Sequence, residues 1–371
     1  MTIDLAHLHV PPVEAGIDRQ TTSWAPVSMT DILAGPLERR RPDLLARTDG
    51  HALFYRGLSS LLFGASESCK SWVGLLAVVE AVRADEHAVI VDLESDPVEI
   101  ATRLRALGLS DSQISNRVAY IRPDEPLRRI LDGPGAPAGP TDHDLADALD
   151  TRPAVVVIDA LGELFALHGL DPLSNRDAPM VTGFLRRLAD RTGAAVISLD
   201  HTPHAPREGG ARAPIGAQHK RAAVTGVAYE VKATSPLAPG HVGKVSLRIN
   251  KDRPGGVREH AMRDTAARIS LDAATHPNQI LATVEPASDG PSDALHARMV
   301  QVAAALADAP DGRSKNQVRQ LVTGKAALTD DALDRLHALG HVKREPGARG
   351  AVVNLLLRPY PTGTADPDVA L

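Results

Sequence analysis

The sequence predicts an α/β fold with a largely parallel sheet, followed by a smaller unit of three helices and a β-hairpin. Apolar runs of strand length alternate with helical segments between about residues 50 and 285, as in a parallel sheet with crossover helices. Polar side chains follow several of these runs, where ligand sites of parallel sheets lie. A stretch of low order at 286–293 then separates this region from the C-terminal segments.

Composition limits the classes of function. The chain has 371 residues, enough for two modest domains or for one large domain with an appendage. Its net charge of −5 excludes a global basic field, so any nucleic-acid site is local. A single cysteine excludes an internal disulfide framework and a Cys-based zinc site. No apolar run approaches the ~20 residues that span a bilayer, which favours a cytoplasmic protein with no membrane partner.

The expected elements follow in chain order. Residues 1–45 carry scattered prolines and read as a partly ordered leader, and residues 46–285 form the predicted core. The strands predicted within that core are Leu58–Phe63, Ala88–Leu93, Val118–Ile121, Ala154–Ile158, Ala194–Leu199, Ala228–Ala233, Lys244–Asn250, Ala267–Leu271 and Gln279–Val284. The last four are more typical of antiparallel edge strands.

An octapeptide at 64–71, GASESCKS, lies between the first of these strands and an apolar helical stretch. Strand, tight loop and helix in that order are the context of a phosphate-binding P-loop, in which loop N–H groups and the helix dipole favour phosphate charge. Lys70 is expected to reach the β- and γ-phosphates of ATP, and the Ser71 hydroxyl to hold Mg²⁺. The predicted nucleotide-binding residues are Gly64, Ala65, Ser66, Glu67, Ser68, Cys69, Lys70, Ser71 and Trp72.

Cys69 departs from the G-x-x-x-x-G-K-[ST] pattern, which has glycine at that position. If the position needs a left-handed backbone, a residue other than glycine costs roughly 1–2 kcal/mol. A thiol beside Lys70 at a helix N-terminus is also expected to have a lowered pKa and to be open to oxidation. The alternative is a tolerated substitution that slows turnover.

Further polar residues complete the expected nucleotide site. Asp159 ends the apolar run Ala154–Ile158 and is predicted to be the second Mg²⁺ ligand. Glu94 follows another core strand and is the preferred general base over Asp92, the alternative being a loop carboxylate. His201 follows a third strand and is the candidate sensor of the γ-phosphate.

Residues 294–360 contain three helical segments and a Gly-rich hairpin, which together predict a winged helix. Between Pro291 and Tyr360, ten Lys and Arg oppose seven Asp and Glu, a net charge of +3. The hairpin residues Lys343, Arg344 and Arg349 are candidate DNA phosphate contacts, with a protein partner as the alternative. The last residues, 361–371, are expected to be disordered.

The ordered set GASESCKS, VDLESD, VVVIDALGELF, SLDHTPH, PIGAQHKRAAVTGVAYEV and RINKDRPGG resembles the RecA-like P-loop ATPases, and within them the RepA-type hexameric helicases. The resemblance implies ATP and Mg²⁺ as cofactors, a homo-oligomeric ring and single-stranded DNA in its channel. It implies that Glu94 is the catalytic base and that Lys251 and Arg253, in Lys-x-Arg, reach a neighbouring subunit's nucleotide. It also implies that Lys220 and Arg221 face the channel and contact DNA; a solvated basic loop is the alternative.

The sequence therefore favours Mg²⁺-dependent ATP hydrolysis coupled to DNA binding or remodelling, helicase-like in plasmid, phage or chromosomal replication. A regulatory nucleotide-binding switch, whose winged helix binds a partner or an operator, is the second interpretation.

Overall fold

The computed structural model describes residues 26–37, 39–133, 135, 137–202, 220, 222–287, 293–347 and 352–361. The chain divides into two compact units, Met1–Arg39 and Arg40–Leu371. In the first unit, helix α1 (Met29–Ala34) begins after Ser28, whose hydroxyl accepts a hydrogen bond from the Asp31 amide. Such an N-cap satisfies one of the amide groups that a helix start leaves without a partner.

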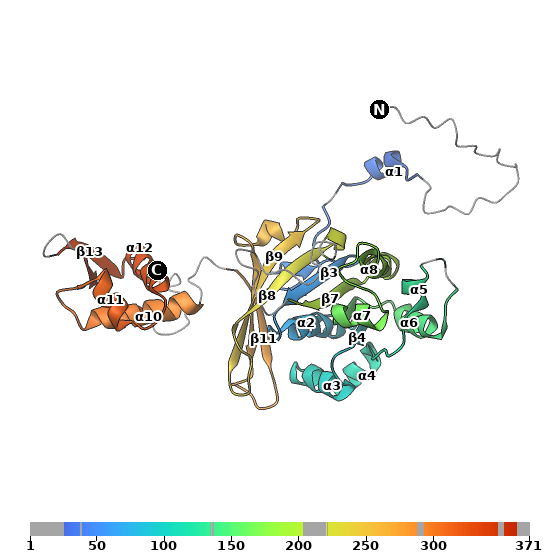
Figure 1. The fold of residues 1–371 in the computed structure, drawn as a ribbon, viewed down its shortest axis with the longest axis horizontal. Helices are drawn as coiled ribbons and strands as arrows, with labels where there is room; N and C mark the ends of the chain where they lie inside the picture. The colour runs from blue at the N-terminus through green and yellow to red at the C-terminus, as the bar shows by residue number, and fades with distance from the viewer. Residues whose placement is uncertain are drawn as a thin grey trace, which may run out of the picture. The chain divides into compact units, whose positions relative to one another are not determined.

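A nine-stranded sheet forms the centre of the second unit (Figure 1), with the strand order β11-β10-β9-β8-β3-β7-β6-β4-β5. The strands from β8 to β5 pair in parallel, whereas β8, β9, β10 and β11 pair antiparallel. The strands are β3 (Ser59–Gly64), β4 (Ala88–Asp92), β5 (Val118–Ile121), β6 (Val155–Asp159), β7 (Ala195–His201), β8 (Val227–Ser235), β9 (Val242–Asp252), β10 (Thr265–Asp272) and β11 (Leu281–Pro286).

The predicted strands of this sheet are all confirmed, each within two residues of its expected ends. The sequence missed the antiparallel hairpin of β1 (Leu44–Ala46) and β2 (Ala52–Phe54), because three-residue strands are too short to show alternation. Leu44 and Leu45 are buried in the main core. The compact unit therefore begins at Arg40, ahead of residue 46, where the sequence placed the start of the core.

Crossover helices connect the parallel strands, as parallel pairing requires. These and the other helices of the region are α2 (Lys70–Arg83), α3 (Pro97–Ala106), α4 (Asp111–Arg117), α5 (Arg128–Leu131), α6 (Pro140–Asp150), α7 (Leu161–Leu167), α8 (Ala178–Thr192) and the short 3₁₀ helix η1 (Arg258–His260). In the described part of the chain, no helix combines the length and apolarity needed to cross a membrane.

The two faces of the sheet bury different side chains of the same strands. In β3, Leu62 belongs to the cluster around α2, whereas Leu61 and Phe63 belong to the cluster that includes α7 and α8. In β4, Ile90 and Val91 divide between the faces in the same way. Since successive strand residues point to opposite faces, these continuous apolar runs fit a sheet that is covered on both sides.

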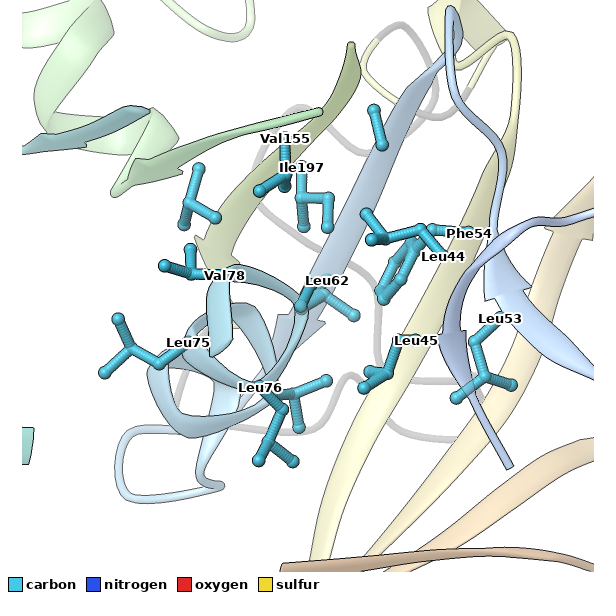
Figure 2. Packing of buried hydrophobic residues seen from close by; sticks show 14 of the residues in the cluster. Leu44, Leu45, Leu53, Phe54, Leu62, Leu75, Leu76, Val78, Val155 and Ile197 are labelled. Atoms are coloured by element: carbon cyan, nitrogen blue, oxygen red, sulfur yellow. The ribbon is translucent and has the colours of Figure 1, made fainter. Parts of the chain in front are cut away.

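The β1–β2 hairpin packs beside the α2 face of the sheet. Figure 2 shows Leu44 and Phe54 of the hairpin close to Leu62 of β3 and in the same cluster as Val78 of α2. The Glu80 carboxylate of α2 also accepts the amides of Leu45 and Ala46, at 2.6 and 2.7 Å. The hairpin is therefore fixed to α2 by both apolar contacts and charge-assisted hydrogen bonds.

The C-terminal segment contains three helices and a three-stranded antiparallel sheet of order β12-β14-β13. Its elements are α10 (Asp293–Ala307), β12 (Arg313–Ser314), α11 (Lys315–Leu321), α12 (Ala326–Ala338), β13 (Val342–Pro346) and β14 (Val352–Leu356). A separate core, which includes Met299, Val318 and Leu336, lies among these elements. The sequence predicted the three helices and the hairpin, but not β12.

Candidate active site

Four neighbouring parallel strands bring their carboxyl ends to one edge of the sheet. Gly64 at the end of β3 pairs with His201 of β7, and Asp92 of β4 pairs with Asp159 of β6. Because parallel strands end at the same edge, polar residues from distant parts of the sequence meet there. The octapeptide 64–71 begins at this edge.

The loop between β3 and α2 has the backbone geometry of an anion-binding turn. Cys69 adopts a left-handed conformation with φ 67° and ψ 24°, and Glu67 has φ 61°. Among the residues that the structure describes, no side chain caps the start of α2, so its first amides are available to a ligand. The left-handed backbone at Cys69 explains why the sequence pattern has glycine at this position.

Gly64 occupies a space that admits no side chain. A Cβ atom at this position would lie 2.3 Å from the Val231 carbonyl oxygen and 2.8 Å from the Ser68 hydroxyl. The Ser68 hydroxyl is buried and has no hydrogen-bond partner within the described structure. The first glycine of the loop is therefore required for close packing, and Ser68 leaves a donor for a ligand in the loop.

Lys70 is folded into the loop. Its side-chain Nζ donates to the carbonyl oxygens of Gly64 and Ala65, at 3.2 and 2.9 Å, and the residue is only 5% exposed. Burial lowers the pKa of Lys70, while the nearby carboxylates of Asp159, Glu94 and Asp200 oppose the shift. The ammonium group thus lies against the backbone of the loop in which phosphate is expected.

Ser71 and Asp159 are in direct contact, as expected for two residues that share a metal ion. The Ser71 hydroxyl donates to Oδ2 of Asp159 at 2.6 Å. Burial raises the pKa of Asp159 to about 6, the Ser71 hydrogen bond opposes this, and Glu94 and Asp92 reinforce it. Hydroxyl and carboxylate oxygens are hard ligands, so this pair fits Mg²⁺, whose charge would compensate the buried carboxylate.

Asp92 and Glu94 have different environments. Asp92 is fully buried, and its Oδ1 accepts the amides of Glu94 and Ser95, both at 2.9 Å. Its Oδ2 is buried without a hydrogen-bond partner within the described structure. Asp92 therefore shapes the turn after β4, and Glu94 lies beyond the strand end with a partly exposed carboxylate.

Glu94, His201 and Lys70 form a polar chain across the strand ends. Nε2 of His201 lies 2.8 Å from Oε1 of Glu94. Nδ1 of the same ring lies 3.5 Å from Nζ of Lys70. The three residues that were expected to act as base, sensor and phosphate ligand are therefore brought together by β3, β4 and β7.

Lys220 contradicts the expectation that it contacts DNA. Its side chain is 2% exposed, and its Nζ donates to Oδ2 of Asp200 at 2.9 Å. The ammonium also lies 5.1 Å from the centre of the Phe165 ring. A lysine buried in an ion pair cannot reach a phosphate backbone, so this prediction is wrong.

Asp200 was missed as a structural residue by the sequence reasoning, although a signal was present. It is an acidic residue inside the apolar end of a core strand, 3% exposed, where an isolated charge is costly. Burial raises its pKa, and the Lys220 ammonium opposes the shift. Such a residue predicts a buried cation, but the sequence does not say which one.

Lys251 and Arg253 lie at and just beyond the end of β9. Nζ of Lys251 donates to the carbonyl oxygens of Ala222 and Val224, both at 2.9 Å, whereas the Arg253 side chain is exposed. Lys251 thus contacts the backbone of its own chain, and Arg253 points to solvent. Arg221 lies outside the described residues.

The basic residues of the C-terminal hairpin have acidic partners. Lys343 pairs with Glu345 at 2.6 Å, and Arg344 pairs with Asp334 of α12. Arg349 lies outside the described residues. A DNA phosphate at Lys343 or Arg344 would have to displace a carboxylate.

The thiol of Cys69 differs from expectation. Burial raises its pKa, and the charges of Lys70 and Arg103 only partly offset this effect. A thiol with a raised pKa contains less of the reactive thiolate at neutral pH. The expected lowering of the pKa is therefore wrong, and the redox hypothesis loses its physical basis.

We expect the backbone at Cys69, rather than its thiol, to determine nucleotide affinity. Cys69→Gly and Cys69→Ala should bind a fluorescent ATP analogue within about threefold of wild type, because glycine removes the strain and alanine is as compact as cysteine. Cys69→Val should bind about tenfold more weakly or worse, since a β-branched residue is strained at positive φ. Weak binding by Cys69→Ala alone would show that the thiol contributes.

Breaking the Lys220–Asp200 pair should destabilise the core strongly. Lys220→Met leaves the Asp200 carboxylate buried without a cation, and we expect the free energy of unfolding to fall by about 3–5 kcal/mol in urea denaturation. The matched control is Lys232→Met, because Lys232 is an exposed lysine of β8. The free energy of unfolding of this control should change by no more than about 0.5 kcal/mol. Equal stability of both variants would contradict the ion pair.

Comparison with known proteins gave a family match and a similar solved structure. A family model described as an AAA domain matches residues 36–207, a range that includes the loop 64–71, Glu94, Asp159 and His201. A solved KaiC-like protein from the archaeon Pyrococcus horikoshii OT3 is 14% identical, with a TM-score of 0.43, over 67% of this chain and 98% of that chain. No curated protein matches the chain. The family match, together with the parallel sheet and its loop geometry, supports a RecA-like P-loop ATPase.

Proposed function

We propose that this protein is a Mg²⁺-dependent ATPase that works on DNA as a homo-oligomeric ring, related to the RepA-type hexameric helicases. The main support is the contact between Ser71 and Asp159, with Glu94 and Lys70 at the same strand ends. A P-loop serine, a strand-end aspartate and a second carboxylate are the groups that ATP hydrolysis needs. Magnesium would neutralise phosphate charge when bound.

In this proposal each residue has one role. The loop amides and Lys70 bind the β- and γ-phosphates and stabilise the charge that develops during phosphoryl transfer. Glu94 accepts the proton of the water that attacks the γ-phosphorus, and ADP is the leaving group. His201 contacts both Glu94 and Lys70. A γ-phosphate that binds Lys70 therefore changes the contact of Lys70 with His201, and through His201 the hydrogen bonding of Glu94. His201 is thus the proposed sensor.

The role of Arg253 depends on a neighbouring subunit. Its exposed side chain can reach a second copy of the chain, and a cation supplied in trans stabilises the transferred phosphoryl group. Lys251 is anchored to the carbonyl oxygens of Ala222 and Val224, which supports a positioning role for Lys251 and the direct role for Arg253.

The C-terminal segment 294–360 is proposed to be a winged helix, joined to the core by the linker 286–293. The order of three helices and a three-stranded sheet supports this proposal. Its α12 carries Asp330, which pairs with Lys315 and Arg319 of α11. These ion pairs favour DNA contact elsewhere on the protein and support a second candidate, a nucleotide-dependent switch whose winged helix binds a protein partner.

Glu94→Gln tests the enzyme against the switch. The variant should hydrolyse ATP about 10²–10⁴-fold more slowly while it binds ATP normally, because only the proton acceptor is lost. The matched control is Glu285→Gln, an exposed glutamate of β11, which should leave the rate unchanged. Rates are measured with and without single-stranded DNA, beside size-exclusion chromatography with a non-hydrolysable nucleotide. No hydrolysis by wild type, with a monomer in all conditions, would contradict the proposal.

Arg253→Ala tests the ring. It should lower kcat by about 10³-fold or more with little change in ATP affinity, as for arginine fingers. The second variant is Lys70→Ala, which keeps Arg253 but lacks the lysine that binds phosphate. A mixture of the two variants should hydrolyse ATP faster than the two variants do when each is measured alone. This follows because a mixed ring contains some intact sites between subunits. A rate that equals the sum of the two separate rates would indicate that Arg253 acts within its own subunit or not at all.

A further inference from the structure

A cavity separate from the ATP site lies between α6 and the C-terminal half of α8. Its volume is about 1080 Å³. Gly193, at the end of α8, contributes to its wall and precedes β7 at the amino end of that strand. The candidate ATP site lies at the opposite, carboxyl end of the same strand. The cavity therefore belongs to a different edge of the sheet from the P-loop.

Arginine side chains dominate the charge of this cavity. The arginines that line it come from α5, from the turn after α6 and from α8: Arg129, Arg152, Arg187 and Arg191. Within the described residues, none of them forms an ion pair with a carboxylate. Unpaired guanidinium groups that face a common space are suited to an anion, because each offers a planar set of donors.

Two of these arginines are partly removed from solvent. The Nε atom of Arg129 is buried and has no hydrogen-bond partner within the described structure. Arg187 is half-buried, and its Nη1 lies against Gly183, 3.2 Å from where a Cβ atom of that glycine would stand. Burial lowers the pKa of Arg187, and the charges of Arg186 and Arg191 add to the effect. Buried donors without partners are rare and call for an explanation.

The carboxylates in the cavity do not cancel these charges. Asp142 is buried, and its two oxygens already accept the backbone amides of Arg129 and Gly139, at 3.3 and 2.8 Å. Asp150 and Asp190 are exposed, and neither pairs with an arginine within the described part of the chain. His143 is also exposed in the cavity wall. The guanidinium groups thus outnumber the carboxylates that remain available.

Part of the wall is apolar. Leu145 and Leu149 of α6 and Phe184 and Leu188 of α8 are among the residues that line it. Ligand sites combine such apolar walls with a few convergent polar groups, in volumes of roughly 300–1,000 Å³. The volume of about 1080 Å³ is slightly above that range, which is enough for a ligand of nucleotide size.

We propose that this cavity binds a small phosphorylated molecule whose phosphate contacts Arg129 and Arg187 and whose apolar or aromatic part lies against Phe184 and Leu188. Arginine binds phosphate through paired hydrogen bonds, and these satisfy donors that the protein leaves without an acceptor. The ligand class is a phosphate ester with an apolar ring or chain. The site is separate from the proposed P-loop and does not depend on its activity.

The probe is 1-naphthyl phosphate, titrated into the full-length protein and followed by calorimetry and by the fluorescence of the naphthyl group. We expect saturable 1:1 binding that Arg187→Ala and Arg129→Ala each weaken about tenfold or more, and that Arg187→Lys weakens less. The matched control is Arg186→Ala, because Arg186 is the exposed neighbour on the same helix and does not line the cavity; it should bind as wild type. Neutral 1-naphthol should bind at least tenfold more weakly than the phosphate.

Lys70→Ala distinguishes this site from the P-loop. It should keep its affinity for 1-naphthyl phosphate while it loses ATP binding. Circular dichroism of every variant verifies that the fold is retained. Three results would each overturn the proposal. The first is no binding at millimolar probe, and the second is binding that only Lys70→Ala removes. The third is equal affinity of the probe for Arg186→Ala, Arg187→Ala and Arg129→Ala.

Discussion

The parallel register of β3, β7, β6 and β4 is the constraint on which the candidate active site depends. It sets Gly64 beside His201 and Asp92 beside Asp159, although these residues are far apart in the sequence. Each strand contributes alternate side chains to a different apolar cluster on each face, so a slip of one residue would move every side chain of the strand into the wrong cluster. The apolar core thereby fixes the positions of polar groups that contribute little to its stability.

The same edge of the sheet concentrates charged groups that burial disfavours. Asp200 is compensated within the protein, because Lys220 pairs with it at 2.9 Å. Lys70 and Asp159 are compensated less completely, by backbone carbonyl oxygens and by the Ser71 hydroxyl. Their pKa values shift in the directions that disfavour both charges. Phosphate beside Lys70 and a cation beside Asp159 would restore the missing partners, which is why perturbed groups in this arrangement indicate a ligand site.

Local patterns in the sequence were sufficient for the strands of the main sheet, for the phosphate-binding loop and for the carboxylates that follow β4 and β6. These depend on periodicity, chain order and strand ends, all of which can be read from neighbouring residues. The role of Lys220 depends instead on a partner twenty residues away, Asp200, and on burial beside Phe165 of α7. The charge of the lysine alone does not reveal either. The Cys69 thiol shows the same limit. A nearby cation and a helix start predict a lowered pKa, but desolvation has the larger effect and raises the pKa.

Accessible charge, rather than net charge, determines where a phosphate can bind to this protein. The C-terminal segment has a net positive charge, yet Arg319 and Arg344 each pair with an aspartate. The larger core region contains Arg129 and Arg187 beside a cavity, and neither pairs with a carboxylate among the described residues. A guanidinium that already has a carboxylate partner gains little from a phosphate, because one charge-assisted contact replaces another. A half-buried guanidinium without a partner gains the whole contact, so the arginines of the cavity favour phosphate more than those of the basic segment.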